Sequence, residues 1–308
     1  MTGIDIIGDI HGHATELHSL LKAMDYTEIN GVYQHPERSV IFLGDFIDRG
    51  DEQLEVLRVV SAMCINGHAR AIMGNHEFNA IGWYMSDGQG GFLRPHTDDN
   101  RNQHSKFLKQ IVAGSTMHEA TIQWFKSLPI LLNLPSIRAI HACWHMPSLK
   151  TLAPYLNDDA TFTNSGIIAA FQKGTAEYDA AEVLLKGPEI KLPHNLEFQD
   201  KGKKWRSHAR IRWWEKSTTE LRDLLIGLEG AEQLLPSAEL DISEYHYHEQ
   251  APLFFGHYWL DGIPRIEAEN AVCLDYSVAK GGHLVAYRWN ENIPLLPSFF
   301  MAIPSIGL

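Results

Sequence analysis

The chain is poor in cysteine, has no long hydrophobic run and carries too few basic residues to balance its acidic ones. Its three cysteines, Cys64, Cys143 and Cys273, are too few for a disulfide framework and are typical of a reducing compartment. No segment approaches the roughly 18 to 20 consecutive apolar residues of a membrane-spanning helix. The first eight residues lack the basic and apolar regions of a secretory signal. We therefore expect a cytoplasmic protein with no membrane partner.

The shortage of basic residues excludes one class of partner. The 26 lysines and arginines face 38 aspartates and glutamates, so the formal net charge is −12. A chain with this charge repels polyanions, and we expect no stable binding of nucleic acid. An anionic ligand must instead find a local positive site. One candidate is the run 201–216, which holds seven Lys or Arg beside a single acid, Glu215.

Three tryptophans, Trp205, Trp213 and Trp214, are interleaved with this basic run. Two interpretations of the run are open. In the first, it forms a rim that attracts anions, and its indoles stack on a base or pack on a phosphopeptide. In the second, it forms a helix or hairpin whose tryptophans enter the core.

The composition is otherwise that of a globular protein. Of the 308 residues, 44% are hydrophobic, which is enough for a sizeable core, and no linker or internal repeat divides the chain. We therefore expect one domain over residues 1–308. Short apolar runs at 4–7, 40–43 and 69–73 predict buried strands, and the amphipathic segments between them predict helices. This alternation is typical of an α/β fold with successive βαβ units.

Polar motifs follow each of these three strands. They are Gly8-Asp9-Ile10-His11-Gly12, then Gly44-Asp45-Phe46-Ile47-Asp48-Arg49-Gly50, and then Gly74-Asn75-His76-Glu77. Two later apolar runs, 137–142 and 253–255, end in His141 and in Gly256-His257. Because ligands gather at the carboxyl ends of strands in open α/β sheets, we expect these side chains to meet at one edge.

The candidate metal ligands combine oxygen and imidazole donors without a thiolate. They are Asp9, His11, Asp45, Asn75, His141 and His257. Such a set suits Mn²⁺, Fe or Zn²⁺ better than it suits a structural zinc site. Asp45 offers two oxygens and can bridge two cations, so we expect two divalent metal ions, with manganese preferred. Two ions about 3.5 to 4 Å apart stabilise both the attacking and the leaving oxygen of a displacement at phosphorus.

The five motifs, in this order, resemble the signature of the calcineurin-like metallophosphoesterases, and in particular of their phosphoprotein-phosphatase branch. That branch includes Ser/Thr protein phosphatases and diadenosine tetraphosphatases. The resemblance covers roughly residues 4–145 and 252–288. It implies a four-layer αββα sandwich with an inserted cap or loop region, and the insertions fall at about 83–127 and 146–250. Within the first insertion, we expect the polar stretch 86–105 to form a long loop or cap near the site.

The resemblance also implies a role for each motif residue. Asp9, His11 and Asp45 would hold the first metal, and Asp45, Asn75, His141 and His257 the second. His76 would act as the general acid, oriented by Asp48, and Arg49 would bind the phosphate. A metal-bridging hydroxide would attack phosphorus directly, without a phosphoenzyme.

A second basic residue that binds phosphate is expected in the second insertion, and three candidates are open: Lys186, Arg210 and Arg212. Three functions are open as well. The leading interpretation is a metal-dependent phosphatase that hydrolyses phosphomonoesters and resembles the Ser/Thr protein phosphatases. The first alternative is a hydrolase of dinucleoside polyphosphates such as diadenosine tetraphosphate. The second alternative is a non-catalytic scaffold, against which the intact set of Asp48, Arg49 and His76 argues.

Overall fold

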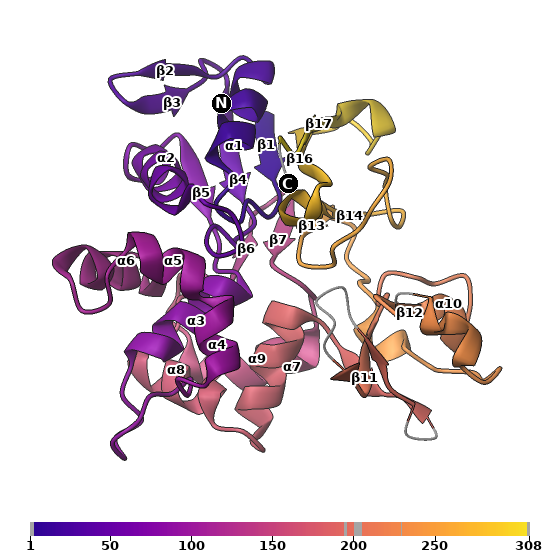
Figure 1. The fold of residues 1–308 in the computed structure, drawn as a ribbon. Coiled ribbons are helices and arrows are strands. Elements are labelled where there is room, and N and C mark those ends of the chain that lie inside the picture. Colours follow the sequence, from indigo (N-terminus) through magenta and orange to yellow (C-terminus); the bar gives the residue numbers. More distant parts are fainter. Residues whose placement is uncertain (1–2, 194–195, 200–204, 229, 307–308) are drawn as a thin grey trace.

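The computed structural model of the chain describes residues 3–193, 196–199, 205–228 and 230–306. The described residues form two large β-sheets and several short ones, with helices around the large sheets and two inserted regions at one end (Figure 1). This is the mixed α/β sandwich that the sequence predicts. Among the helices in the described ranges, none is both long and apolar enough to cross a bilayer.

The first sheet is built around three parallel strands. Its order is β15-β16-β1-β4-β5, and β17 pairs with β16 outside that path. Strands β1, β4 and β5 run parallel, whereas β16 is antiparallel to β1. The bounds are β1 (Gly3–Ile7), β4 (Arg38–Phe42), β5 (Ala69–Ala71), β15 (Asp275–Tyr276), β16 (His283–Asn290) and β17 (Phe300–Pro304). The three strands predicted from the sequence are confirmed to within about two residues at each end.

The second sheet comes from the later part of the chain. Its order is β14-β13-β7-β6, with β13 parallel to both neighbours and β6 antiparallel to β7. The bounds are β6 (Leu131–Asn133), β7 (Arg138–Ile140), β13 (Leu253–Phe255) and β14 (Ala271–Cys273). The segment between β7 and β13 therefore leaves the sandwich and returns to it, as expected for an insertion.

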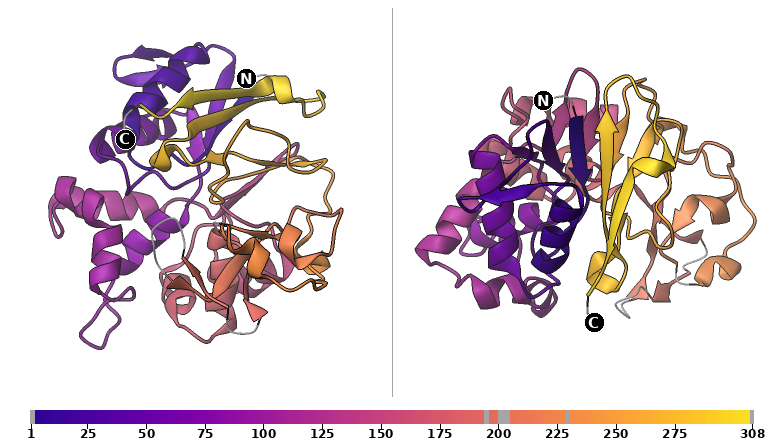
Figure 2. Two further views of the ribbon diagram at one scale, coloured as in Figure 1. Left: turned by 45° about the vertical axis from the view of Figure 1, so that its right-hand side comes forward. Right: turned by 90° about the horizontal axis from the view of Figure 1, so that it is seen from above.

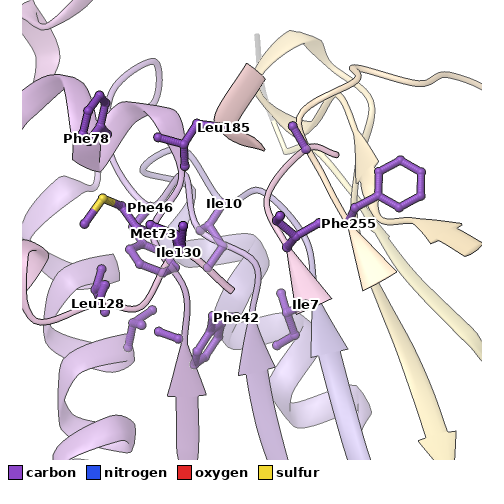
Figure 3. Packing of buried hydrophobic residues seen from close by; sticks show 14 of the residues in the cluster. Ile7, Ile10, Phe42, Phe46, Met73, Phe78, Leu128, Ile130, Leu185 and Phe255 are labelled. Carbon is purple, nitrogen blue, oxygen red and sulfur yellow. The ribbon is translucent and has the colours of Figure 1, made fainter. Parts of the chain in front are cut away.

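Alternate side chains of the strands divide between two cores. In β4, Val40 and Phe42 belong to the outer core, whereas Ile41 belongs to the core shared by the two sheets. In β13, Phe254 belongs to the shared core, whereas Phe255 on the opposite face belongs to the outer core. The outer core continues past the strand ends toward the motif loops, where Figure 3 shows side chains such as Phe46 and Ile10. Because side chains of a strand alternate, both faces of each sheet are covered.

Helices cover the outer face of the first sheet and lead into the insertions. Leu17 and Leu20 of α1 and Val56 and Val60 of α2 pack in the outer core. The helices of this region are α1 (Ala14–Ala23), α2 (Gln53–Ile65) and α3 (Asn75–Tyr84), and α3 begins at the third motif. The short strands β2 (Thr27–Ile29) and β3 (Val32–Gln34) form a separate hairpin.

The two inserted regions lie on the same side of the sheets, below them in Figure 1 and in the left view of Figure 2. The first insertion holds α4 (Asp98–Gln103), α5 (Ser105–Gln110) and α6 (Thr116–Lys126). The stretch 86–105 is therefore only partly a loop, because α4 and the start of α5 lie within it.

The second insertion has two parts. Its helices are α7 (Met146–Leu152), α8 (Asn164–Phe171) and α9 (Ala176–Lys186). The rest holds β8 (Glu189–Lys191), β9 (Phe198–Gln199), β10 (Trp205–Arg206), β11 (His208–Ile211), α10 (Leu221–Leu224) and β12 (Leu225–Ile226). Ile211 and Leu224 pack there in a small core of their own. The assignment of residues 1–308 to a single domain stays a prediction.

A core substitution tests the packing of the sandwich. Phe254 is fully buried in the core shared by the two sheets. We expect Phe254→Ala to lower the free energy of unfolding by about 3 to 5 kcal/mol, because the truncated side chain leaves a cavity. Urea unfolding followed by circular dichroism measures this loss. Val112→Ala, at a position that is 67% exposed, is the control and should change the stability by less than about 0.5 kcal/mol. Equal losses in the two variants would contradict the packing.

Candidate metal centre

All six predicted metal ligands lie where strands end, at one edge of the two sheets. Asp9 and His11 follow β1, Asp45 follows β4, and Asn75 opens α3 after β5. His141 and His257 follow β7 and β13. Each of the six side chains is at most 7% exposed. The structure therefore gathers the residues of all five motifs into one buried group.

Asp45 stands in the middle of this group. Its Oδ2 lies 3.5 Å from Nε2 of His11 and 3.4 Å from Nε2 of His141. Two sets of side chains with donor atoms within 4.8 Å of one another share this carboxylate: His11, Asp45 and His76, and Asp45, His141 and His257. A carboxylate common to two sets is the arrangement that a residue bridging two cations requires. His76 belongs to one set, so distance alone does not separate it from the ligands.

The backbone at Asp45 forms a tight turn that Glu77 holds in place. Oε2 of Glu77 accepts hydrogen bonds from the backbone N–H of Asp45 (2.8 Å) and Gly74 (3.0 Å), and Oε1 accepts one from Phe46 (2.8 Å). Asp45 has a left-handed backbone with φ 51°, and its Oδ1 accepts from the backbone N–H of His76 at 2.9 Å. Strained backbone of this kind gathers at functional sites. The sequence gives Glu77 a place in a motif but no role.

Two motif glycines permit the close approach of the strand ends. Gly44 has a φ of +91°, and a Cβ at this position would lie 2.4 Å from the backbone nitrogen of Gly74. A Cβ on Gly256 would lie 2.0 Å from Oδ1 of Asp9. The residues before Asp45 and His257 must therefore be glycine for the two ligands to reach their places.

Hydrogen bonds orient two of the imidazoles through one nitrogen each. Nδ1 of His11 donates to the backbone carbonyl of Ile47 (2.9 Å), and Nδ1 of His141 donates to that of Leu43 (2.8 Å). Each ring therefore turns Nε2 toward Asp45. Nε2 of His11 and both ring nitrogens of His257 are buried with no hydrogen-bond partner in the described part of the chain. Unpaired buried nitrogens are costly, and ligation of a metal satisfies them.

The buried carboxylates of this group need positive charge nearby to remain ionised. Burial, reinforced by Asp275, raises the pKa of Asp9 well above its usual range. Burial also acts to raise the pKa of Asp45, but the imidazoles of His141 and His76 overcome it and hold that pKa well below normal. Although burial opposes it, Asp45 in turn raises the pKa of His141 to about 10. Divalent cations supply the positive charge that such a group needs, so the donor set fits them.

His76 and Asp48 form a buried pair beside Asp45. Nδ1 of His76 lies 2.6 Å from Oδ2 of Asp48, and Nε2 of His76 lies 3.9 Å from Oδ2 of Asp45. A further imidazole, that of His104, lies 2.9 Å from Oδ1 of Asp48. Burial acts to raise the pKa of Asp48, but the charges of His104 and His76 hold it well below its usual range. His104 comes from the first insertion, and no motif in the sequence marks it.

A cleft of about 1020 Å³ opens at this edge of the sheets and is lined by residues of both insertions. Asp45, Asn75, His76 and His257 line its inner end. Its basic residues are Arg49, Arg94, Lys173, Lys186, Arg206, Arg210, Arg212, Arg265 and Lys280. All four residues predicted to bind substrate are among them. The cleft is therefore the cationic surface that the acidic chain as a whole lacks.

The predicted substrate-binding residues differ in their surroundings. The guanidinium of Arg49 lies 5.1 Å from the ring centroid of Trp259, a residue that no motif predicts. Burial, followed by the charge of Arg210, lowers the pKa of His257 well below its usual range. Lys186 pairs with Glu182 one turn earlier in α9, and Arg210 lies beside Glu189. All three candidates of the second insertion, Lys186, Arg210 and Arg212, line the cleft.

The basic run divides between the core and the cleft. Trp213 and Trp214 are buried, and Nε1 of Trp213 donates to the backbone carbonyl of Ala142 at 3.1 Å. Trp205 lines the cleft, with 66% of its surface exposed. The second interpretation is confirmed for Trp213 and Trp214, whereas the role that the first gives to an exposed indole stays a prediction for Trp205. Lys201, Lys203 and Lys204 lie outside the described residues.

Hydrolysis of phosphoesters is the chemistry that this arrangement serves. Cations held by carboxylates and imidazoles, with basic side chains facing them across a cleft, bind and polarise a phosphate group. The class is that of the metal-dependent phosphoesterases. A family model described as calcineurin-like phosphoesterase matches residues 3–186. The chain belongs to this family and is a metal-dependent phosphoric ester hydrolase, so the resemblance of the five motifs is confirmed and the scaffold alternative is not supported.

Two relatives differ in how much of the chain they match. A symmetrical bis(5'-nucleosyl)-tetraphosphatase of Marinomonas sp. is 29% identical over 298 residues, which cover 93% of this chain and 94% of that protein. An asymmetrical bis(5'-nucleosyl)-tetraphosphatase of Oceanobacillus iheyensis is 30% identical over 140 residues, 45% of this chain and 54% of that protein. The chain thus spans about half of the second relative.

Among solved structures, a protein serine/threonine phosphatase from Saccharomyces cerevisiae superposes with a TM-score of 0.52. The superposition covers 100% of this chain and 80% of that one, at 15% sequence identity. At this identity the similarity shows the fold alone.

Substitution of His76 tests whether this residue is a general acid or a metal ligand. We expect His76→Asn to lower kcat by roughly 10²- to 10⁴-fold, as removal of a general acid does, while the metal content stays near that of the wild type. Turnover of an aryl phosphate and elemental analysis of the same sample measure the two quantities. Loss of metal in proportion to activity would show that His76 is a ligand and that its assignment as an acid is wrong.

Substitution of Asp45 tests the bridging carboxylate. We expect Asp45→Asn to abolish binding of the pair of ions, because a neutral amide offers one oxygen where two cations need a charged group. Elemental analysis after dialysis against Mn²⁺ measures the metal content. Asp51→Asn is the matched control, since this nearby carboxylate is 76% exposed and pairs with Lys106. Two ions per chain in the Asp45 variant would contradict the bridging role.

Proposed function

We propose that this enzyme hydrolyses dinucleoside tetraphosphates, and that it splits them symmetrically into two nucleoside diphosphates. The observation that carries the proposal is the match to the Marinomonas tetraphosphatase, which extends over 93% of this chain, so that most of both insertions falls within it. The matches to asymmetrical enzymes cover less than half of the chain. The names of these relatives favour the first alternative drawn from the sequence over the phosphomonoesterase.

The size and charge of the cleft support this substrate class. A volume of about 1020 Å³ is at the upper end of the roughly 300 to 1,000 Å³ typical of ligand sites, whereas one phosphate group fills a small part of it. Arg49 comes from the sandwich, Arg94 from the first insertion and Arg210 from the second. In the proposed binding mode, these three guanidinium groups bind different phosphates of the chain, whose charge is distributed along its length.

Trp205 is the side chain that we assign to a nucleobase. It lies at the cleft with its indole largely exposed, whereas Trp213 is buried and Trp214, although it lines the cleft, is only 3% exposed. Stacking of a base on an aromatic side chain contributes about 1 to 3 kcal/mol and needs no particular base. The polyphosphate would then lie between the base on Trp205 and the metal centre.

The chain's own residues divide the work of the reaction. Asp9, His11, Asp45, Asn75, His141 and His257 would hold two divalent ions, for which we propose manganese. When bound, these ions supply Lewis-acid activation of water and neutralise phosphate charge. Arg49 binds two oxygens of the reacting phosphate through its planar guanidinium. Asp48 orients His76, whose Nε2 donates a proton to the leaving oxygen. We place the reaction in the cytoplasm.

A side-by-side assay with Mn²⁺ tests the substrate. The three substrates are diadenosine tetraphosphate, a phosphopeptide and a generic aryl phosphate. We expect kcat/KM for the tetraphosphate to exceed the others by roughly 100-fold or more, as a site built for polar contacts discriminates strongly, and the product to be ADP alone. A preference for the phosphopeptide would contradict the proposal and favour a protein phosphatase instead. Formation of ATP and AMP would contradict symmetrical cleavage.

Arg210 provides a test of the extended phosphate site. We expect Arg210→Met to raise KM for diadenosine tetraphosphate by roughly tenfold or more, the loss expected for a charged hydrogen bond, and to leave KM for an aryl phosphate nearly unchanged. Steady-state kinetics on both substrates measures the difference. The control is Lys150→Met, an exposed position in α7 that does not line the cleft. Equal effects on the two substrates would refute a role specific to the polyphosphate.

A further inference from the structure

Asp48 lies between two imidazoles, one on each carboxylate oxygen. Oδ2 is 2.6 Å from Nδ1 of His76, and Oδ1 is 2.9 Å from Nδ1 of His104. A carboxylate only accepts hydrogen bonds, so each imidazole must donate through Nδ1. His104 is 56 residues from Asp48 in the sequence and belongs to the first insertion. The insertion therefore supplies one of the two donors that hold this carboxylate.

His104 is closed off from solvent and from substrate. It is 0% exposed, Asp48 is 1% exposed, and neither side chain is among the described residues that line the cleft. Nε2 of His104 has no hydrogen-bond partner among the described residues. Its polar contact is therefore made through Nδ1 and directed at Asp48. A contact of this kind between buried groups is stronger than the same contact in water.

Two sets of contacts fix His104 relative to the loop that carries Asp48. Its ring stacks on Phe107, with centroids 4.6 Å apart and an interplanar angle of 20°. In α5, Lys106 forms an ion pair with Asp51 (2.5 Å), and the side chain of Gln110 accepts from the backbone N–H of Leu54 (3.2 Å). The helix that follows His104 is thus attached to the chain directly after the second motif. The insertion and the motif form one packed unit.

We propose that His104 is a positioning residue for the catalytic pair of Asp48 and His76. With its Oδ1 bound by His104, the carboxylate of Asp48 is not free to rotate, and Oδ2 stays directed at Nδ1 of His76. The ring of His76 is then held with Nε2 toward the metal centre, where the leaving oxygen receives its proton. This inference rests on the role of His76 as general acid, and it does not depend on which phosphoester is the substrate.

Three variants of His104 distinguish the contribution of its Nδ1 hydrogen-bond donor from the contribution of the size of its ring. His104→Asn places an amide nitrogen close to the position of Nδ1, whereas His104→Gln places it close to Nε2. His104→Phe keeps the ring and its stacking on Phe107 but has no donor. We expect the Phe and Gln variants to lower kcat about 10- to 100-fold, by analogy with residues that orient metal ligands through hydrogen bonds, with KM within about twofold of the wild type. The Asn variant should recover most of the loss.

Aryl phosphates with good and poor leaving groups distinguish a positioning role of His104 from a purely structural one. A purely structural defect should slow the hydrolysis of both kinds equally. Phenyl phosphate needs protonation of its leaving oxygen, whereas 4-nitrophenyl phosphate needs it much less. A misplaced acid must therefore slow phenyl phosphate more, and we expect His104→Phe to show a larger loss on phenyl than on 4-nitrophenyl phosphate. Equal losses on the two substrates, or no loss on either, would overturn the proposal.

A second measurement does not use activity. In ¹⁵N-labelled protein loaded with Zn²⁺, which is diamagnetic and leaves the spectrum observable, the Nδ1 proton of His76 should give a low-field NMR signal while its bond to Asp48 is intact. We expect this signal in the wild type and in His104→Asn, and its loss by exchange in His104→Phe and His104→Gln. A sharp, unshifted signal in His104→Phe would contradict the proposal even if that variant were slower.

His118 is the matched control for a buried histidine of the same insertion. It is 2% exposed and its Nε2 also lacks a hydrogen-bond partner in the described chain, while its Nδ1 accepts from the backbone N–H of Gly114 at 3.2 Å. We expect His118→Phe to leave kcat on both aryl phosphates within about twofold of the wild type, because it makes no contact that fixes Asp48. A loss as large as that of His104→Phe would assign the effect to the packing of the insertion instead. Failure of the wild type to cleave diadenosine tetraphosphate would refute the proposed function and leave this comparison on aryl phosphates intact.

Discussion

The buried carboxylate of Asp45 is the group on which the rest of the site depends. A carboxylate that is 1% exposed is stable only where donors or cations surround it. The backbone N–H of His76 reaches one oxygen, and the imidazoles of His11 and His141 approach the other. Those contacts require β1, β4, β5 and β7 to end at the same level, and Gly44 and Gly74 to pass each other without a Cβ. The ends of the strands and the identity of the glycines thus follow from the need to accommodate this one charge.

The sandwich and the insertions contribute different parts of the chemistry. Every proposed metal ligand follows a strand of the sandwich or opens α3, where packing on both faces fixes its position. The first insertion contributes His104, which contacts Asp48, and Arg94, which lines the cleft, and the second contributes Arg210. A centre built by the sandwich can therefore be shared by enzymes with different substrates. The shape and charge of the cleft depend on what is inserted between the strands.

The sequence predicts the parts of this site whose signals are local. A strand followed within one or two residues by Gly-Asp or Gly-Asn is visible in a short window, so β1, β4 and β5 are found without a structure, together with Asp9, Asp45 and Asn75. His11 belongs to the first of these motifs, and His141 and His257 stand at the ends of two later apolar runs. His104 and Trp259 are not found, because their partners Asp48 and Arg49 are far away in the chain and neither residue belongs to a motif. The sequence also does not predict which of the indoles of Trp205, Trp213 and Trp214 are buried. Composition does not distinguish an indole that enters the core from one at the cleft. Long-range packing decides each of these cases.

The pairing of charges within the cleft indicates how a polyphosphate would be held. Lys186, Arg210 and Arg265 each lie beside a carboxylate, namely Glu182, Glu189 and Glu267, which reduces their pull on a distant anion. Arg49 instead lies on the indole of Trp259, and Arg94 is hydrogen-bonded to the neutral amides of Asn100 and Gln103. Neither of these two cations forms an ion pair within the described part of the chain, and both line the cleft. A phosphomonoester needs only Arg49, whereas a longer chain gains Arg94 and competes with Glu189 for Arg210. The charges of the cleft therefore favour a substrate with several phosphates over one with a single phosphate, in an enzyme whose net charge repels both.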